Sequence, residues 1–144
     1  MSKSFDAATH DWKPLVPELV VRDINSSLHF WRDLLGFRIL FGREAERFAY
    51  LEREGAEVML EEAGDRSWTV GAMERPLGRG INLQIETRDL SAVLEALATA
   101  EWELYRQPEE RWYEVGTRHV GQRQFLVQDP DGYLVRFAQG LGIR

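Results

Sequence analysis

Hydrophobic and polar positions alternate clearly near the end of the chain, in the stretch VQDPDGYLVRFAQG. Val135 and Phe137 share one face of the expected strand, and Arg136 lies on the other. The DPDG sequence is typical of a hairpin turn, because Pro130 presets one turn dihedral and Gly132 accepts a left-handed conformation. The pattern therefore predicts a β-hairpin whose second strand carries a charge that needs a partner.

The first half of the chain begins with another strand-like run, which ends at Asp23. The apolar residues that follow fall at helical spacing, so a helix is expected, with Asn25 or Ser26 as its N-cap and Gly36 at its end. Three strand-like runs come next, RILFG, RFAYLERE and AEVMLEE, with a turn at Gly55 between the last two. This half therefore predicts a β-α-β-β-β order.

Residues 80–139 repeat that order. GINLQIETRD predicts a strand ending at Asp89, LSAVLEALATAE a helix, and WELYRQ, RQFLVQD and GYLVRFAQ three further strands. The repetition indicates an internal duplication and an α+β fold built from two βαβββ modules. The expected organisation is an N-terminal arm (1–14), a first module (15–63), a linker (64–79), a second module (80–139) and a C-terminal tail (140–144).

Alternation along the strands predicts which side chains share a face. Each module covers one face of its sheet with a helix and leaves the other open, so two modules can close around a cleft, within one chain or between two. The helix side is expected to hold Leu15, Leu19 and Val21. The expected cleft side comprises Val16, Glu18, Val20, Glu57, Met59, Glu61, Asn82, Gln84, Glu86 and Arg136. Glu61 and Arg136 come from corresponding strands, so we expect them to form an ion pair in the cleft.

Composition narrows the class of protein. The chain has 144 residues, 44% hydrophobic and 29% charged, as in an ordinary soluble domain. It has no cysteine, which excludes disulfides and thiolate chemistry, and its net charge of −6 argues against nucleic-acid binding while allowing a cationic ligand. No apolar run is long enough to span a membrane, and the N-terminus does not read as a signal peptide, so a cytoplasmic location is expected.

The chain resembles the vicinal oxygen chelate superfamily, which includes glyoxalase I, extradiol dioxygenases and bleomycin resistance proteins. The resemblance rests on the duplicated units and on two stretches, RDINSSLHFWRDLLGF and FLVQDPDGYLVRF. The resemblance implies that metal ligands of the enzymes would correspond to Val16, Glu61, Asn82 and Arg136. Only Glu61 suits a divalent metal, because valine and arginine cannot ligate and asparagine is a poor ligand. The resemblance therefore implies no metal, no other cofactor and no catalytic residue.

Bleomycin resistance proteins share these features: a glutamate ends the first module, an arginine occupies the last site, and no metal is held. The resemblance implies a homodimer that binds a small molecule, such as a cationic glycopeptide antibiotic, on an acidic and aromatic surface. Two alternatives remain open: a metal-dependent glyoxalase, lyase or dioxygenase with displaced ligands, and a binder of some other metabolite.

The ligand-binding candidates combine the cleft positions with aromatic residues in connecting segments. Trp68 falls in the linker, and Trp112 and Tyr113 fall in QPEERWYEVGTRHVG, which is expected to be a long loop. Other positions have more ordinary expectations: Trp12 docks the arm onto a neighbouring surface, and the three histidines are solvated or locally hydrogen-bonded. The complete set of candidates is Glu18, Glu61, Trp68, Asn82, Trp112, Tyr113 and Arg136.

Overall fold

The computed structural model of the chain describes residues 4–144. Its first half forms a four-stranded sheet of order β1-β4-β3-β2, in which β1 is parallel to β4 and the other neighbours are antiparallel. The elements are β1 (Glu18–Val21), α1 (Ile24–Leu28) with a π-helical continuation (His29–Leu34), β2 (Arg38–Arg43), a 3₁₀ turn (Glu44–Glu46), β3 (Phe48–Arg53) and β4 (Ala56–Glu62).

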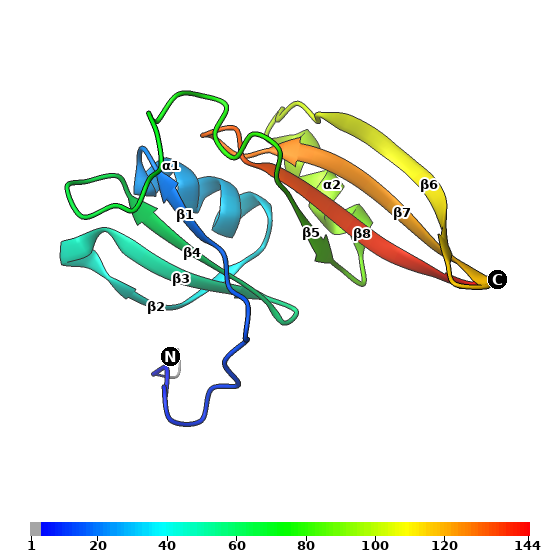
Figure 1. Ribbon diagram of the computed structural model, residues 1–144, viewed down its shortest axis with the longest axis horizontal. Coiled ribbons are helices and arrows are strands. Elements are labelled where there is room, and N and C mark those ends of the chain that lie inside the picture. Colours follow the sequence, from blue (N-terminus) through cyan, green and yellow to red (C-terminus); the bar gives the residue numbers. More distant parts are fainter. Residues whose placement is uncertain (1–3) are drawn as a thin grey trace.

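The second half repeats this topology in a sheet of order β5-β8-β7-β6, with β5 parallel to β8. Its elements are β5 (Asn82–Glu86), α2 (Leu90–Thr99), β6 (Arg106–Val115), β7 (Arg118–Gln128) and β8 (Leu134–Ile143). Figure 1 shows the two modules next to each other, joined by the linker that follows β4. The expected α+β fold of two βαβββ modules is confirmed.

Both helices begin in the same way. The Asp23 carboxylate accepts hydrogen bonds from the backbone N–H groups of Asn25 and Ser26, and Asp89 caps α2 equivalently. The predicted N-cap at Asn25 or Ser26 is wrong, because both residues already lie in the first turn.

The end of each module also binds its own helix. A Glu62 carboxylate oxygen accepts from the Ile24 N–H at 3.0 Å, and the Gln139 side-chain oxygen accepts from the Leu90 N–H at 2.9 Å. Since the first N–H groups of a helix have no partner within it, these bonds hold each helix to the last strand of its module.

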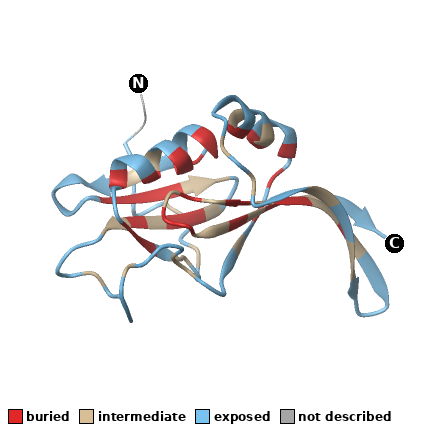
Figure 2. Cartoon of the chain, turned by 90° about the horizontal axis from the view of Figure 1, so that it is seen from above, coloured by how far each residue is buried: buried red, intermediate tan, exposed pale blue. Residues whose placement is uncertain are grey.

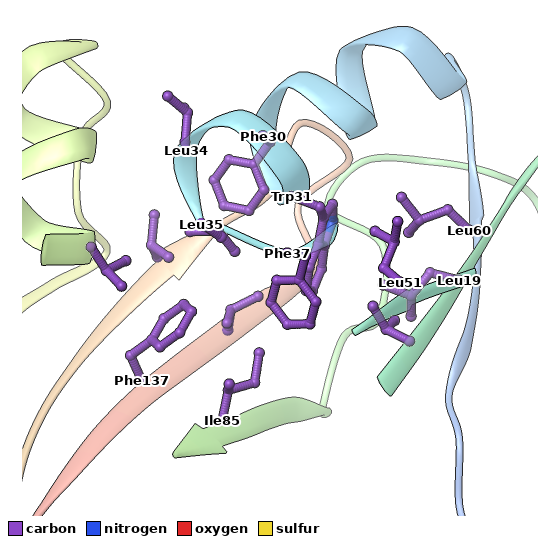
Figure 3. Packing of buried hydrophobic residues seen from close by; sticks show 14 of the residues in the cluster. Leu19, Phe30, Trp31, Leu34, Leu35, Phe37, Leu51, Leu60, Ile85 and Phe137 are labelled. Atoms are coloured by element: carbon purple, nitrogen blue, oxygen red, sulfur yellow. The ribbon is translucent and has the colours of Figure 1, made fainter. Parts of the chain in front are cut away.

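One hydrophobic cluster spans both modules. Leu51 and Leu60 of the first sheet and Ile85 and Phe137 of the second converge on the helical segment that carries Trp31 (Figure 3). Figure 2 shows the buried residues where helices meet sheets, whereas the outer part of the long ribbon that ends at the C-terminus is mostly exposed. The modules therefore share a core rather than each having its own.

Each module also clasps the other through a hairpin turn. Glu54, in the turn between β3 and β4, accepts from Thr87 Oγ1 at 2.9 Å and from the Arg88 N–H at 3.2 Å, just before α2. Asp131, in the turn between β7 and β8, accepts from the Arg22 N–H at 3.3 Å and from its Nε at 3.1 Å, just before α1. These reciprocal contacts follow the internal symmetry of the duplication.

The structure corrects three local predictions. Leu15 does not pack beneath α1: it precedes β1 and its side chain is 85% exposed. The predicted loop around Trp112 is a hairpin, formed by β6 and β7 with a turn at Gly116. β8 continues to Ile143, so residues 140–143 belong to a strand rather than to a tail. Within residues 4–144, no helix is long and apolar enough to cross a membrane.

Candidate functional site

The open face of the first sheet combines carboxylates with aromatic rings. Register places Glu18 opposite Met59 and Phe48 opposite Glu61, and alternation directs these side chains away from α1. Phe41 and Tyr50, from paired strands, stack at 4.9 Å between ring centroids. We call this surface the acidic–aromatic face; its residues are Glu18, Phe41, Phe48, Tyr50, Glu57, Met59 and Glu61.

Two predicted site residues meet on this face. Glu18 on β1 and Glu61 on β4 interact closely: burial first, and then the Glu61 carboxylate, raise the pKa of Glu18 above its usual value, while Arg43 acts in the opposite direction. Like charges that approach each other favour sharing a proton or attracting a cation. This corner of the face is therefore suited to a positively charged group.

The middle of the face is buried and hydrogen-bonded. Tyr50 donates to Glu57 at 2.6 Å, and burial together with this bond raises the pKa of the phenol. His10 of the N-terminal arm lies on the other side of the carboxylate, with Nε2 2.8 Å from Glu57 Oε2. The Glu57 carboxylate therefore has a neighbour from the sheet and one from the arm. His10 was predicted to be solvated or locally hydrogen-bonded, and it contacts a carboxylate distant in the sequence instead.

The arm covers part of the acidic–aromatic face with aromatic side chains. Phe5 stacks on Phe41 at 5.0 Å between ring centroids, and Trp12 meets Tyr50 edge-on at 5.5 Å. The predicted docking of the arm by Trp12 is confirmed.

The open face of the second sheet has a different chemistry. Gln84 lies opposite Arg136 in the β5–β8 register, and Leu126 lies opposite Arg136 on β7. Gln124 donates to the Tyr113 hydroxyl at 2.8 Å and accepts from Gln122 at 2.6 Å. We call this surface the arginine–amide face; its residues are Asn82, Gln84, Tyr113, Gln122, Gln124 and Arg136.

The predicted ion pair between Glu61 and Arg136 is wrong for a single chain. Among residues 4–144, Arg136 makes no ion pair, and its buried Nε has no hydrogen-bond partner. Glu61 interacts with Glu18 instead. Strand parity assigned both residues to open faces correctly, but the two faces belong to different sheets.

The positions that hold a metal in the enzymes of the resembled family do not fit one here. Val16 lacks a donor atom, Arg136 stays protonated, and Asn82 lies on the other sheet from Glu61. In the described part of the chain, no three His, Cys, Asp or Glu side chains come close enough to hold a metal ion.

The other candidates are dispersed. Trp68 lies in the linker and is 90% exposed. Trp112 and Tyr113 are neighbours on β6 and so point to opposite faces; Trp112 lies against Gly121 of β7 and under the guanidinium of Arg144, 3.9 Å from the ring centroid. Asn82 lines a cavity of about 490 Å³ between the modules, together with Lys13, Leu15, Pro17, Glu57 and Gln84.

Sequence reasoning missed the aromatic part of the site. Phe41, Phe48 and Tyr50 were expected only as strand residues, and the arm was not connected with them. The available signal was the alternation of Phe48 and Tyr50 on β3, with Phe41 on the neighbouring strand β2.

Comparison with known proteins places the chain in a family. Residues 14–137 match the family model of the Glyoxalase/Bleomycin resistance protein/Dioxygenase superfamily. A superfamily member from Vibrio splendidus 12B01 is 36% identical, with 86% of this chain and 95% of that chain covered and a TM-score of 0.40. A comparison with curated proteins found no match.

Two further structures share the fold. TioX from Micromonospora sp. ML1 is 23% identical, covers 90% of this chain and 100% of its own, and has a TM-score of 0.68. A protein of unknown function from Agrobacterium tumefaciens str. C58 is 27% identical, covers 94% and 100%, and has a TM-score of 0.65. These structures share the fold, and the family match over residues 14–137 shows that the chain belongs to the glyoxalase/bleomycin resistance protein/dioxygenase superfamily.

Proposed function

We propose that this chain is a non-catalytic binding protein of the bleomycin resistance type, which sequesters a cationic amphipathic small molecule such as a glycopeptide antibiotic. The observation that carries the proposal is the acidic–aromatic face, where Glu18 and Glu61 interact beside the ring of Phe48. This surface offers charge and stacking area but no nucleophile paired with a base, which suits binding rather than chemistry.

Physical chemistry favours a cation on this face. A cation between Glu18 and Glu61 would relieve the repulsion of the two carboxylates, which is a gain that a neutral ligand cannot supply. Aromatic rings bind cations through their faces, and the chain already does this with Arg43, whose guanidinium carbon lies 3.9 Å from the Phe48 ring centroid. A flat, cationic ligand could replace this internal contact.

A second copy of the chain would close the proposed ligand-binding cleft. The arginine–amide face carries Arg136, which has no ion-pair partner among residues 4–144, while the acidic–aromatic face carries an excess of carboxylates, so the two faces are complementary in charge. In a homodimer with two-fold symmetry, Glu61 of each copy would meet Arg136 of the other, twice. Sedimentation of Glu61→Gln, Arg136→Gln and the double variant tests this pairing: coupled losses of dimer affinity support it, and additive ones contradict it.

Calorimetric titration with metal-free bleomycin tests the ligand. We expect micromolar binding that Glu18→Gln weakens about tenfold, the effect of one charge-assisted contact of about 1.4 kcal/mol. Glu86→Gln is the matched control, because Glu86 is exposed and lies on the second sheet. If the unchanged protein gives no heat of binding, the antibiotic assignment is wrong. If both variants lose the same affinity for bleomycin, the loss comes from the net charge of the protein and not from a contact on the acidic–aromatic face.

Elemental analysis of protein purified without chelators separates this proposal from the enzymatic alternative. Stoichiometric zinc, nickel, iron or manganese would favour a metal-dependent lyase or dioxygenase with displaced ligands. Thermal-shift screening of metabolites addresses a different natural ligand, since a compound that binds only the folded state raises Tm.

A further inference from the structure

The N-terminal arm lies on the acidic–aromatic face and contacts it through side chains, in the way that a bound ligand would. Phe5 and Trp12 contact the stacked pair of Phe41 and Tyr50, and Phe5 and Trp12 also meet each other edge-on at 5.8 Å. Two rings of the arm therefore extend the two rings of the sheet into one aromatic cluster.

The polar contact of the arm is equally specific. His10 Nε2 lies 2.8 Å from the Glu57 carboxylate, whose side chain is only 2% exposed. The His10 ring also packs edge-on against Trp12 at 4.7 Å and Tyr50 at 6.3 Å. An imidazole of the arm thus lies beside a buried carboxylate, among aromatic rings.

The arm is held to the sheet by side chains. Its own hydrogen bonds are local: the Thr9 N–H donates to the Asp6 carbonyl, the Trp12 N–H to the His10 carbonyl, and the Trp12 indole to the Ala7 carbonyl. A groove of about 770 Å³ separates part of the arm from β2, lined by residues that include Phe5, His10 and Leu40. A segment without ladder hydrogen bonds to its neighbour can leave without breaking the sheet.

The arm occupies the part of the acidic–aromatic face formed by Phe41, Tyr50 and Glu57, next to the Glu18–Glu61 corner where the ligand cation is proposed to bind. We propose that residues 5–12 act as an internal competitor, which occupies the acidic–aromatic face with two aromatic rings and an imidazole until a cationic aromatic ligand displaces them. This inference rests on the proposed function, and it makes the ligand class more specific: a cation attached to at least one flat ring. The family match begins at residue 14, so residues 5–12 lie outside the matched segment.

Competition has a measurable consequence. When only a fraction of the molecules has the face uncovered, the apparent affinity falls by that fraction, so an arm that covers about nine molecules in ten weakens binding about tenfold. Variants that loosen the arm should therefore bind a cationic aromatic probe more tightly, whereas a residue that contacts the ligand should weaken binding when truncated.

The test uses the full chain and thioflavin T, a flat aromatic cation. Titrations are compared for the unchanged protein, the Phe5→Ala/Trp12→Ala double variant and His10→Asn, with Tyr105→Ala as a control that removes an exposed aromatic side chain outside the arm. Anilinonaphthalene sulfonate, which is aromatic but anionic, controls for charge. Circular dichroism and thermal unfolding confirm that each variant folds, and hydrogen exchange of residues 4–12 reports whether the probe releases the arm.

We expect both arm variants to bind thioflavin T about five- to tenfold more tightly than the unchanged protein, and the probe to increase exchange in residues 4–12. Unchanged or weaker binding in the arm variants, with binding intact in the unchanged protein, overturns the competitor and leaves the proposed function standing. Failure of every variant to bind the probe overturns the proposed function itself, and the competitor with it.

Discussion

The two hairpin turns perform the same task with different surroundings. Glu54 and Asp131 each accept two hydrogen bonds from the segment that precedes the helix of the other module. The Glu54 side chain is partly exposed and also pairs with Arg53, whereas Asp131 is buried. The second turn additionally holds the linker, because the Leu77 N–H donates to the Asp131 carbonyl. The duplication thus produced equivalent contacts in the two modules, but only the carboxylate of Asp131 is buried.

Gly132 shows how tightly the second turn is built. Its φ of +95° belongs to the left-handed region, and a Cβ atom there would lie 2.6 Å from Pro76 of the linker. In the first turn, Gly55 also has a positive φ, but a Cβ atom would meet nothing within 4 Å. The comparison predicts that stability depends more on the second turn than on the first, and three measurements examine this.

The largest expected effect comes from Trp31→Ala. Trp31 is fully buried between the modules, and its indole N–H donates to Asp129 of the second turn at 3.2 Å. Removing a buried tryptophan costs about 3–5 kcal/mol, and here it also removes one of the three hydrogen-bond donors of a buried carboxylate, leaving the backbone N–H groups of Asp131 and Tyr133. Urea unfolding followed by circular dichroism should show one transition at lower urea. Trp68→Ala, at an exposed position, is the control, and two separate transitions would contradict a shared core.

The next effect is a pH dependence. Burial raises the pKa of Asp129 to about 6, even though hydrogen bonds from Trp31 and Tyr133 act in the opposite direction. The folded chain therefore binds this proton more tightly than the unfolded chain. The stability that the proton confers is present in acid and is lost as pH rises through about 6.

We expect the free energy of unfolding to increase by about 1–2 kcal/mol when pH falls from 7 to 5, since one pKa unit corresponds to about 1.4 kcal/mol. Asp129→Asn should remove this slope, whatever its offset in stability, because an amide does not titrate. A slope that persists in the variant would assign the dependence to another group, such as Glu18, whose pKa is raised by burial and by Glu61.

The smallest effect separates the two clasps directly. Asp131→Ala should destabilise the chain by about 1 kcal/mol, because it leaves the partly buried Arg22 N–H without its acceptor. Glu54→Ala should cost less than about 1 kcal/mol, because water can replace an exposed carboxylate. Equal costs would mean that burial does not distinguish the turns. Paired urea curves under one buffer are sufficient for this comparison.

The sequence predicts those parts of the fold that depend on local signals. The DPDG turn and the helix end at Gly36 follow from residues within a short window, and the duplication follows because the same local order occurs twice. The hairpin of β6 and β7 was missed because it extends beyond the core. Both of its faces are solvated there, so Glu109 to Val115 show no alternation of apolar and polar residues that would indicate a strand.

For the candidate site, the sequence predicted only which side chains of a strand share a face of the sheet. Parity placed Glu18 and Glu61 on one open face, where the structure also places them together. It could not say how the faces of two sheets lie relative to each other, so the expected contact of Glu61 with Arg136 was wrong within one chain. The docking of Phe5 and His10 depends on tertiary contacts across more than thirty residues, which no local pattern encodes.

The reciprocal clasps also limit how the molecule can move. Because each module grips the other at two places around a common core, the modules cannot swing apart as two rigid halves without unfolding part of that core. Access to the open face of the first sheet then has to come from movement of the N-terminal arm, which a short segment containing Pro14 and Pro17 connects to β1. The acidic–aromatic face is therefore opened by displacement of the N-terminal arm and not by a hinge motion between the modules.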